Sequence, residues 1–95
     1  MKESHSLTNN LLMEVDFLSN RLRNIKLSYK TTENKALKGR LFTENKNIFK
    51  RVKEIYKIAK LLNKNNEEIN FSNLLIEITK RTLNENKFES NLFFL

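Results

Sequence analysis

Apolar residues recur at alternating intervals of four and three along two long stretches of the chain, and this spacing constrains the fold most strongly. The first stretch carries Leu11, Val15, Leu18, Leu22, Ile25 and Tyr29, and the second carries Leu41, Asn45, Ile48, Val52, Ile55, Ala59 and Leu62. Residues at this spacing share one face of an α-helix, so each stretch predicts an amphipathic helix with a heptad seam of the coiled-coil type. The chain has no proline and a single glycine, so few residues interrupt long helices.

The same pattern sets the expected number and order of helices. We expect helices over approximately residues 7–29, 33–63 and 67–85, followed by an apolar C-terminal tail over residues 88–95. A chain of 95 residues is expected to form one helical domain, residues 1–95. Short connections between amphipathic helices predict an all-α fold, either a small antiparallel three-helix bundle or a long helical hairpin with a third helix. A dimer of this fold is one alternative.

The residue types that most catalytic and metal sites require are scarce. Cysteine is absent, His5 is the only histidine, and Asp16 is the only aspartate. No histidine and carboxylate have metal-ligand spacing, no glycine-rich loop exists to hold phosphate, and no Ser-His-acid set can form around His5. We therefore expect a protein that is not an enzyme and that uses no cofactor and no metal.

The apolar runs of the chain are short, and none has the length of a transmembrane helix. The N-terminus lacks the apolar segment of a signal peptide. We therefore expect a cytoplasmic protein without a transmembrane segment. Lysine and asparagine are both frequent, which indicates an AT-rich genome because both residues have AT-rich codons.

Positive charge is concentrated in the second predicted helix. The formal net charge is +7, and residues 35–64 hold ten Lys or Arg against two Glu, whereas the rest of the chain is close to neutral. Six lysines at four-and-three spacing form a lysine stripe on the side away from the apolar seam: Lys46, Lys50, Lys53, Lys57, Lys60 and Lys64. One interpretation is a track that contacts phosphates or an acidic protein surface. The other is a solvated helix face that is rich in lysine because of codon usage.

Two groups of apolar residues lie outside the heptad seams. Met13 and Phe17 point away from the first seam, so they either contact the third helix or the tail in the core, or form a dimer or partner surface. The tail ends in the run Leu92, Phe93, Phe94 and Leu95. These four residues either fold back onto the core or dock as a hydrophobic anchor into a groove of another protein.

Asn45 interrupts the second apolar seam. A buried asparagine at such a position can fix the register or the oligomeric state of packed helices. We expect the simpler arrangement, in which Asn45 lies near a helix end and its side chain reaches water.

These features favour a small non-enzymatic protein–protein interaction module, an adaptor or a regulator. Met13, Phe17 and the C-terminal tail would anchor the partner, and the lysine stripe would steer a partner with an acidic surface. A homodimer is a further alternative for the apolar surface. The alternative function is a sequence-tolerant nucleic-acid-binding protein that uses the same lysines, with a strong dependence of binding on salt. Arginine, which reads bases through bidentate contacts, is absent from the stripe.

Overall fold

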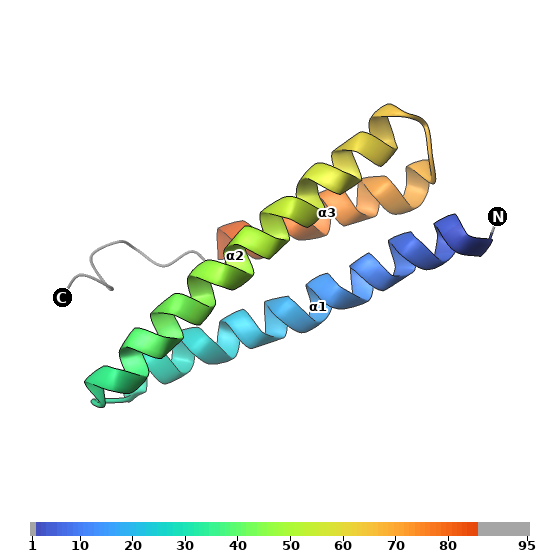
Figure 1. The fold of residues 1–95 in the computed structure, drawn as a ribbon. Helices are drawn as coiled ribbons and strands as arrows, with labels where there is room; N and C mark the ends of the chain where they lie inside the picture. The colour runs from blue at the N-terminus through green and yellow to red at the C-terminus, as the bar shows by residue number, and fades with distance from the viewer. Residues whose placement is uncertain (1, 86–95) are drawn as a thin grey trace.

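The structure is a computed structural model that describes residues 2–85 of the chain, with the side chains described from residue 7 onward. It consists of three α-helices: α1 (Lys2–Thr31), α2 (Lys35–Lys64) and α3 (Ile69–Glu85). Figure 1 shows α1 and α2 as a long antiparallel hairpin, with α3 folded back along it. The predicted all-α three-helix bundle is confirmed for the described residues, which contain no strand.

The helix bounds differ slightly from the predicted ones. The first helix begins at Lys2 rather than near residue 7, because no proline or glycine in the preceding residues interrupts it. The second helix begins after Asn34, whose side-chain oxygen accepts a hydrogen bond of 3.0 Å from the backbone N–H of Leu37. An asparagine at this position satisfies one of the N–H groups that a helix leaves without an intrahelical partner.

The connection from α2 to α3 is a tight turn. The backbone N–H of Asn65 donates to the carbonyl of Leu61, which closes the last turn of α2. Asn66 and Glu68 then adopt positive φ angles of 59° and 49°. Asparagine tolerates this left-handed conformation better than most residues, and the two reversals direct α3 back along α2.

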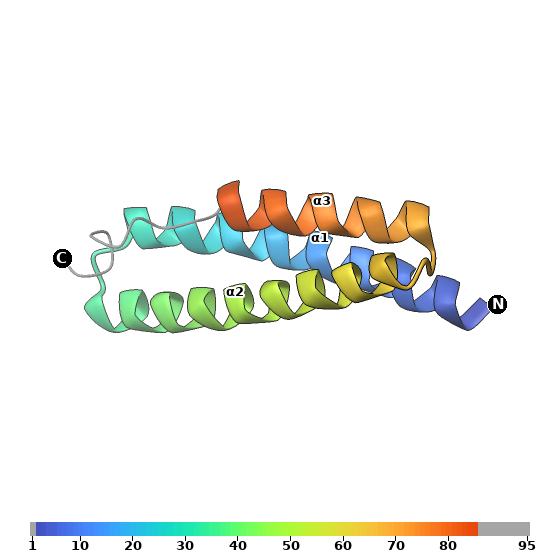
Figure 2. The same ribbon diagram turned by 90° about the horizontal axis from the view of Figure 1, so that it is seen from above.

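The core is built from two clusters of buried side chains along the hairpin. All three helices contribute to one of them, made of Leu11, Val15, Ile55, Ala59 and Leu75. The other is made by α1 and α2: Leu22, Ile25, Tyr29, Leu41, Ile48 and Val52. Leu83, near the end of α3, packs against this second cluster, and α3 ends two residues later. Figure 2 shows that α3 accompanies only the part of the hairpin that holds the N-terminal half of α1 and the C-terminal half of α2.

Asn45 lies within the second core region, and the prediction that its side chain reaches water is wrong. It is only 7% exposed, because α2 already begins at Lys35 and Asn45 is therefore well inside the helix. Its side-chain nitrogen has no hydrogen-bond partner within the part of the chain that the structure describes. Such an amide lowers stability, since the nitrogen has lost its water without gaining an acceptor.

Candidate interaction surfaces

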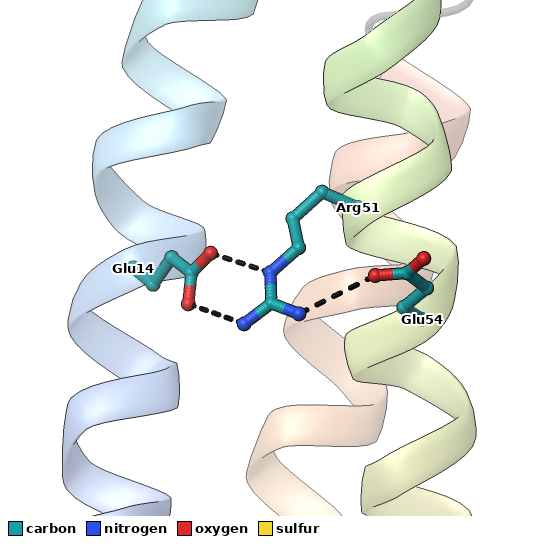
Figure 3. Close-up of polar contacts among 3 residues, drawn as sticks. All are labelled: Glu14, Arg51 and Glu54. Carbon is teal, nitrogen blue, oxygen red and sulfur yellow. Dashed lines mark hydrogen bonds and ion pairs between the residues drawn. The ribbon is translucent and has the colours of Figure 1, made fainter.

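Two ion pairs cross from α1 to α2 and hold the hairpin in register. Arg51 donates two hydrogen bonds to Glu14, from Nε at 2.6 Å and from Nη2 at 2.9 Å. Its Nη1 contacts Glu54 on its own helix at 3.4 Å, as Figure 3 shows. Arg21 binds Glu44 in the same two-pronged way, at 2.6 and 2.7 Å. Bidentate pairs of this kind fix geometry as well as charge, so they define how α1 faces α2.

Both carboxylates of these pairs are held in the ionised form. The hydrogen bonds from Arg51 lower the pKa of Glu14, and those from Arg21 lower the pKa of Glu44; partial burial opposes both shifts. The same contacts raise the pKa of Arg51 and of Arg21 further above their usual range. Two of the five arginines of the chain are therefore engaged inside the hairpin and contribute little to its free positive charge.

The lysine stripe is free of such neutralisation. All six of its lysines are exposed, and none of them forms an ion pair with a described residue. The ammonium group of Lys60 lies 5.4 Å from the ring centre of Tyr56, a cation–π distance. At about 1.5 Å per residue the stripe extends for roughly 27 Å along α2.

The C-terminal end of the stripe lies beside the contact between α2 and α3. Asn63 of α2 donates hydrogen bonds to Ser72 at 3.1 Å and to Asn73 at 2.8 Å, so this side of α2 faces α3. Lys60 lies three residues before Asn63 and is therefore its neighbour on the helix surface.

Lys80 joins this surface from α3, and the sequence pattern had not indicated it. It is exposed and lies seven residues after Asn73, so it shares the side of α3 that faces α2. The seven-residue interval between Asn73 and Lys80 is visible in the sequence, but it assigns Lys80 to this surface only once the contact between Asn63 and Asn73 is known.

The outer face of α1 differs from the lysine stripe, because it presents apolar side chains instead of charged ones. Met13 and Phe17 are 63% and 67% exposed, so the alternative that they pack in the core against the third helix is wrong, whereas the alternative contact with the tail lies outside the described residues. Leu27, which sequence reasoning missed, is also 63% exposed. Together with two exposed asparagines these residues form the outer stripe of α1, again at four-and-three spacing: Met13, Phe17, Asn20, Asn24 and Leu27. The outer stripe contains no charged side chain.

The structure therefore brings the predicted lysines together on one surface and the predicted apolar pair together on another. The two surfaces lie on different helices: the lysine stripe lies on α2, and the outer stripe lies on α1, where its last residue, Leu27, lines a hollow together with Glu85 of α3. The predicted anchor residues Leu92, Phe93, Phe94 and Leu95 lie outside the described residues, so both interpretations of the tail stay predictions.

Among residues 7–85, whose side chains the structure describes, no group of three or more His, Cys, Asp or Glu side chains is arranged to hold a metal ion. None of the three described helices has the length and apolar character needed to cross a membrane. No family model, no curated protein and no solved structure matches the chain.

Proposed function

We propose that this chain is a small, non-enzymatic protein–protein interaction module that acts as an adaptor or regulator. The observation that carries the proposal is the exposure of Met13 and Phe17 on a helix whose opposite face already supplies the core. An exposed row of large apolar side chains is costly in water, and its burial against a partner favours binding. Aromatic and methionine side chains are also enriched at protein interfaces.

The lysine stripe supplies the second part of the proposal, attraction of an acidic partner. Its charges are exposed and form no ion pair with a described residue, and Glu54 is the one acidic residue of α2 beside them, so most of their field extends into the solvent. Charge of one sign along a helix accelerates encounter with a surface of the opposite sign, and the acceleration falls as salt screens it. Anchoring on α1 and steering by α2 are thus separate tasks on separate surfaces. The tail residues Leu92–Leu95 stay a proposed additional anchor.

Nucleic-acid binding is the alternative, and the length of the lysine stripe favours it. A stripe of roughly 27 Å offers repeated contacts to a phosphate backbone, and Lys80 broadens it. Arg21 and Arg51 are both held in ion pairs, so they are not placed to read bases. Binding through this surface would therefore be tolerant of sequence and strongly dependent on salt.

Affinity capture from the native cell, with and without nuclease, separates the two functions. We expect a protein partner that survives nuclease, that is captured by the wild-type chain, and that is lost with Phe17→Glu. Asn47→Glu is the matched control, because it places the same charge on an exposed position of α2 off both stripes. Capture that disappears with nuclease and with lysine reversal, but persists with Phe17→Glu, would establish the alternative instead.

A further inference from the structure

The third helix ends before the hairpin does. Glu85, the last residue of α3, lines an open hollow of about 330 Å³ together with four residues of α1: Arg23, Lys26, Leu27 and Lys30. In Figure 2, α3 stops short of the connection between α1 and α2. The seam between the two long helices continues there and still supplies Tyr29 and Leu41 to the core. The hollow therefore lies where the third layer of the bundle ends.

The hollow combines an apolar side chain with positive charge. Leu27 is 63% exposed, although it lies beside the end of α3. Arg23, Lys26 and Lys30 form no ion pair with a described residue, and Glu85 is the one acidic residue of the lining. A hollow of this size is at the lower end of the range for ligand pockets, so it suits a few side chains. An occupant with apolar side chains and a carboxylate would match it.

The residues that follow Glu85 have this composition. Phe88 lies three residues after it, Glu89 comes next, and the apolar run Leu92–Leu95 follows. Phe88 is within reach of the hollow, since three residues span at most about 11 Å in any conformation. Large apolar side chains favour a site that removes them from water, and Glu89 adds the carboxylate that three nearby cations attract.

The covalent connection favours this segment over a separate protein as the occupant. A binding segment joined to its site by a few residues has an effective concentration in the millimolar range. A free partner has to reach a comparable concentration to compete for the hollow. Weak apolar contacts are therefore sufficient for the tail and insufficient for most other occupants.

We propose that the apolar segment Phe88–Leu95 docks in the hollow of its own chain, beside Leu27 and the end of α3. The inference goes beyond the proposed function, in which Leu92–Leu95 are an additional anchor for a partner. A segment held in the hollow is withheld from a partner, so a partner that uses this anchor has to displace it first. The hollow then regulates access to the tail.

A spin label tests where the segment docks. The chain has no cysteine, so Asn24→Cys accepts a nitroxide label at one exposed position next to Arg23. We expect this label to broaden the NMR signals of residues 88–95. Asn10→Cys is the matched control, because it replaces another exposed asparagine on nearly the same side of α1, about 21 Å further back. A label there should leave those signals sharp.

Two outcomes of the labelling experiment overturn the proposal. Signals of residues 88–95 that respond equally to both labels, or to neither, mean that the segment does not dock in the hollow. A mixture of spin-labelled chain with isotope-labelled chain that carries no spin label tests for exchange between molecules. Broadening of equal strength in that mixture means that the tail of a second copy occupies the hollow.

Thermal unfolding of the whole chain gives an independent readout. Leu27→Ser and Met13→Ser replace side chains of α1 that are both 63% exposed, so their difference reports contacts outside the described residues. We expect Leu27→Ser to lower the midpoint by at least about 4 °C more than Met13→Ser does. Serine substitution of the five apolar tail residues, Phe88 and Leu92–Leu95, should abolish this difference, because it removes the other half of the contact. A difference that persists, or one that is absent from the start, contradicts docking.

The two proposals fail in different ways. Failure of both tests removes the docked tail and leaves the proposed function standing if cellular capture still depends on Phe17. Capture that is indifferent to Phe17→Glu, with a tail that docks as described, would remove the proposed function and leave this inference intact.

Discussion

The two long helices of this protein have matching inner faces and contrasting outer faces. Both α1 and α2 have 30 residues, and both supply heptad seams to the same two core clusters. Outside, α1 presents a neutral apolar stripe, whereas α2 presents six exposed lysines. Similar inner faces are what the bundle requires, and they explain its fold. The unlike outer faces are not required by the fold, so they are the features that point to function.

The largest expected effect is the difference between substitutions on the inner face and on the outer face of α1. Leu22→Ala removes a fully buried side chain from the inner face of α1 and should lower the free energy of unfolding by about 2–5 kcal/mol. Phe17→Ala, on the outer face, should change it by about 0.5 kcal/mol or less in the monomer. Chemical denaturation at low protein concentration, where a dimer dissociates, measures both. Equal losses for the two variants would mean that the outer face also contributes to the fold.

The second prediction concerns the outer face of α2. Reversing three stripe lysines, in Lys53→Glu/Lys57→Glu/Lys60→Glu, should weaken binding of an acidic polypeptide such as polyglutamate at low salt by at least about tenfold. The free energy of unfolding should change little, because these side chains are exposed. Fluorescence anisotropy with a labelled ligand at two salt concentrations measures the effect.

A second triple variant controls for net charge. Lys26→Glu/Lys35→Glu/Arg40→Glu changes the net charge of the chain by the same amount but leaves the stripe intact. If both triple variants weaken binding equally, the stripe is no more than a solvated helix face, and the net charge alone attracts the ligand.

The periodicity of the sequence predicted the apolar inner faces of α1 and α2 and the lysine stripe of α2, because each of these features depends only on residue spacing within one helix. It did not predict contacts between helices. The two ion pairs illustrate the reason: Glu14 and Arg21 are seven residues apart on α1, and their partners Arg51 and Glu44 are seven apart on α2. Those pairs follow from the spacing only after the position of the connection and the antiparallel packing are fixed.

The burial of Asn45 and the exposure of Leu27 were not predicted either, because they too depend on where the helices begin and how they pack. The burial of Asn45 depends on where α2 begins, which Asn34 determines through its cap. Leu27 was missed because two asparagines separate it from Phe17, so the outer stripe does not stand out as an apolar series. Its exposure is evident only when the side of α1 that faces α2 and α3 is known.

Asn45 is the one polar side chain in the apolar seam of α2, and its replacement tests how well the inner face of this helix is packed. Asn45→Leu should raise the free energy of unfolding by about 1 kcal/mol, because it replaces an amide nitrogen that has no partner with apolar atoms of similar size. Asn47→Leu, the same change at an exposed position of α2, should have little effect. Thermal and chemical denaturation measure both variants. Destabilisation by Asn45→Leu would show that the asparagine contributes to the core through its amide.

The smallest expected effect comes from the ion pair between Glu14 and Arg51, which joins α1 to α2 at the edge of their inner faces. The pKa of Glu14 is lowered in the folded chain by its hydrogen bonds to Arg51, so the stabilisation is present above the ordinary glutamate pKa of about 4.3 and is lost as the pH falls through the lower folded value. Since both side chains are about a third exposed or more, the pair should contribute only about 0.2–1 kcal/mol. Glu44 and Arg21 should behave in the same way.

A double-mutant cycle with Glu14→Gln and Arg51→Gln isolates this contribution from the packing of the two side chains. The coupling energy should be favourable at neutral pH and should vanish at strongly acidic pH, because a protonated Glu14 no longer carries the charge that Arg51 attracts. Glu54→Gln is the useful control, since its contact with Arg51 is longer and lies within α2. A coupling energy that persisted at acidic pH would mean that the two residues stabilise the hairpin through apolar contact of their side chains rather than through their charges.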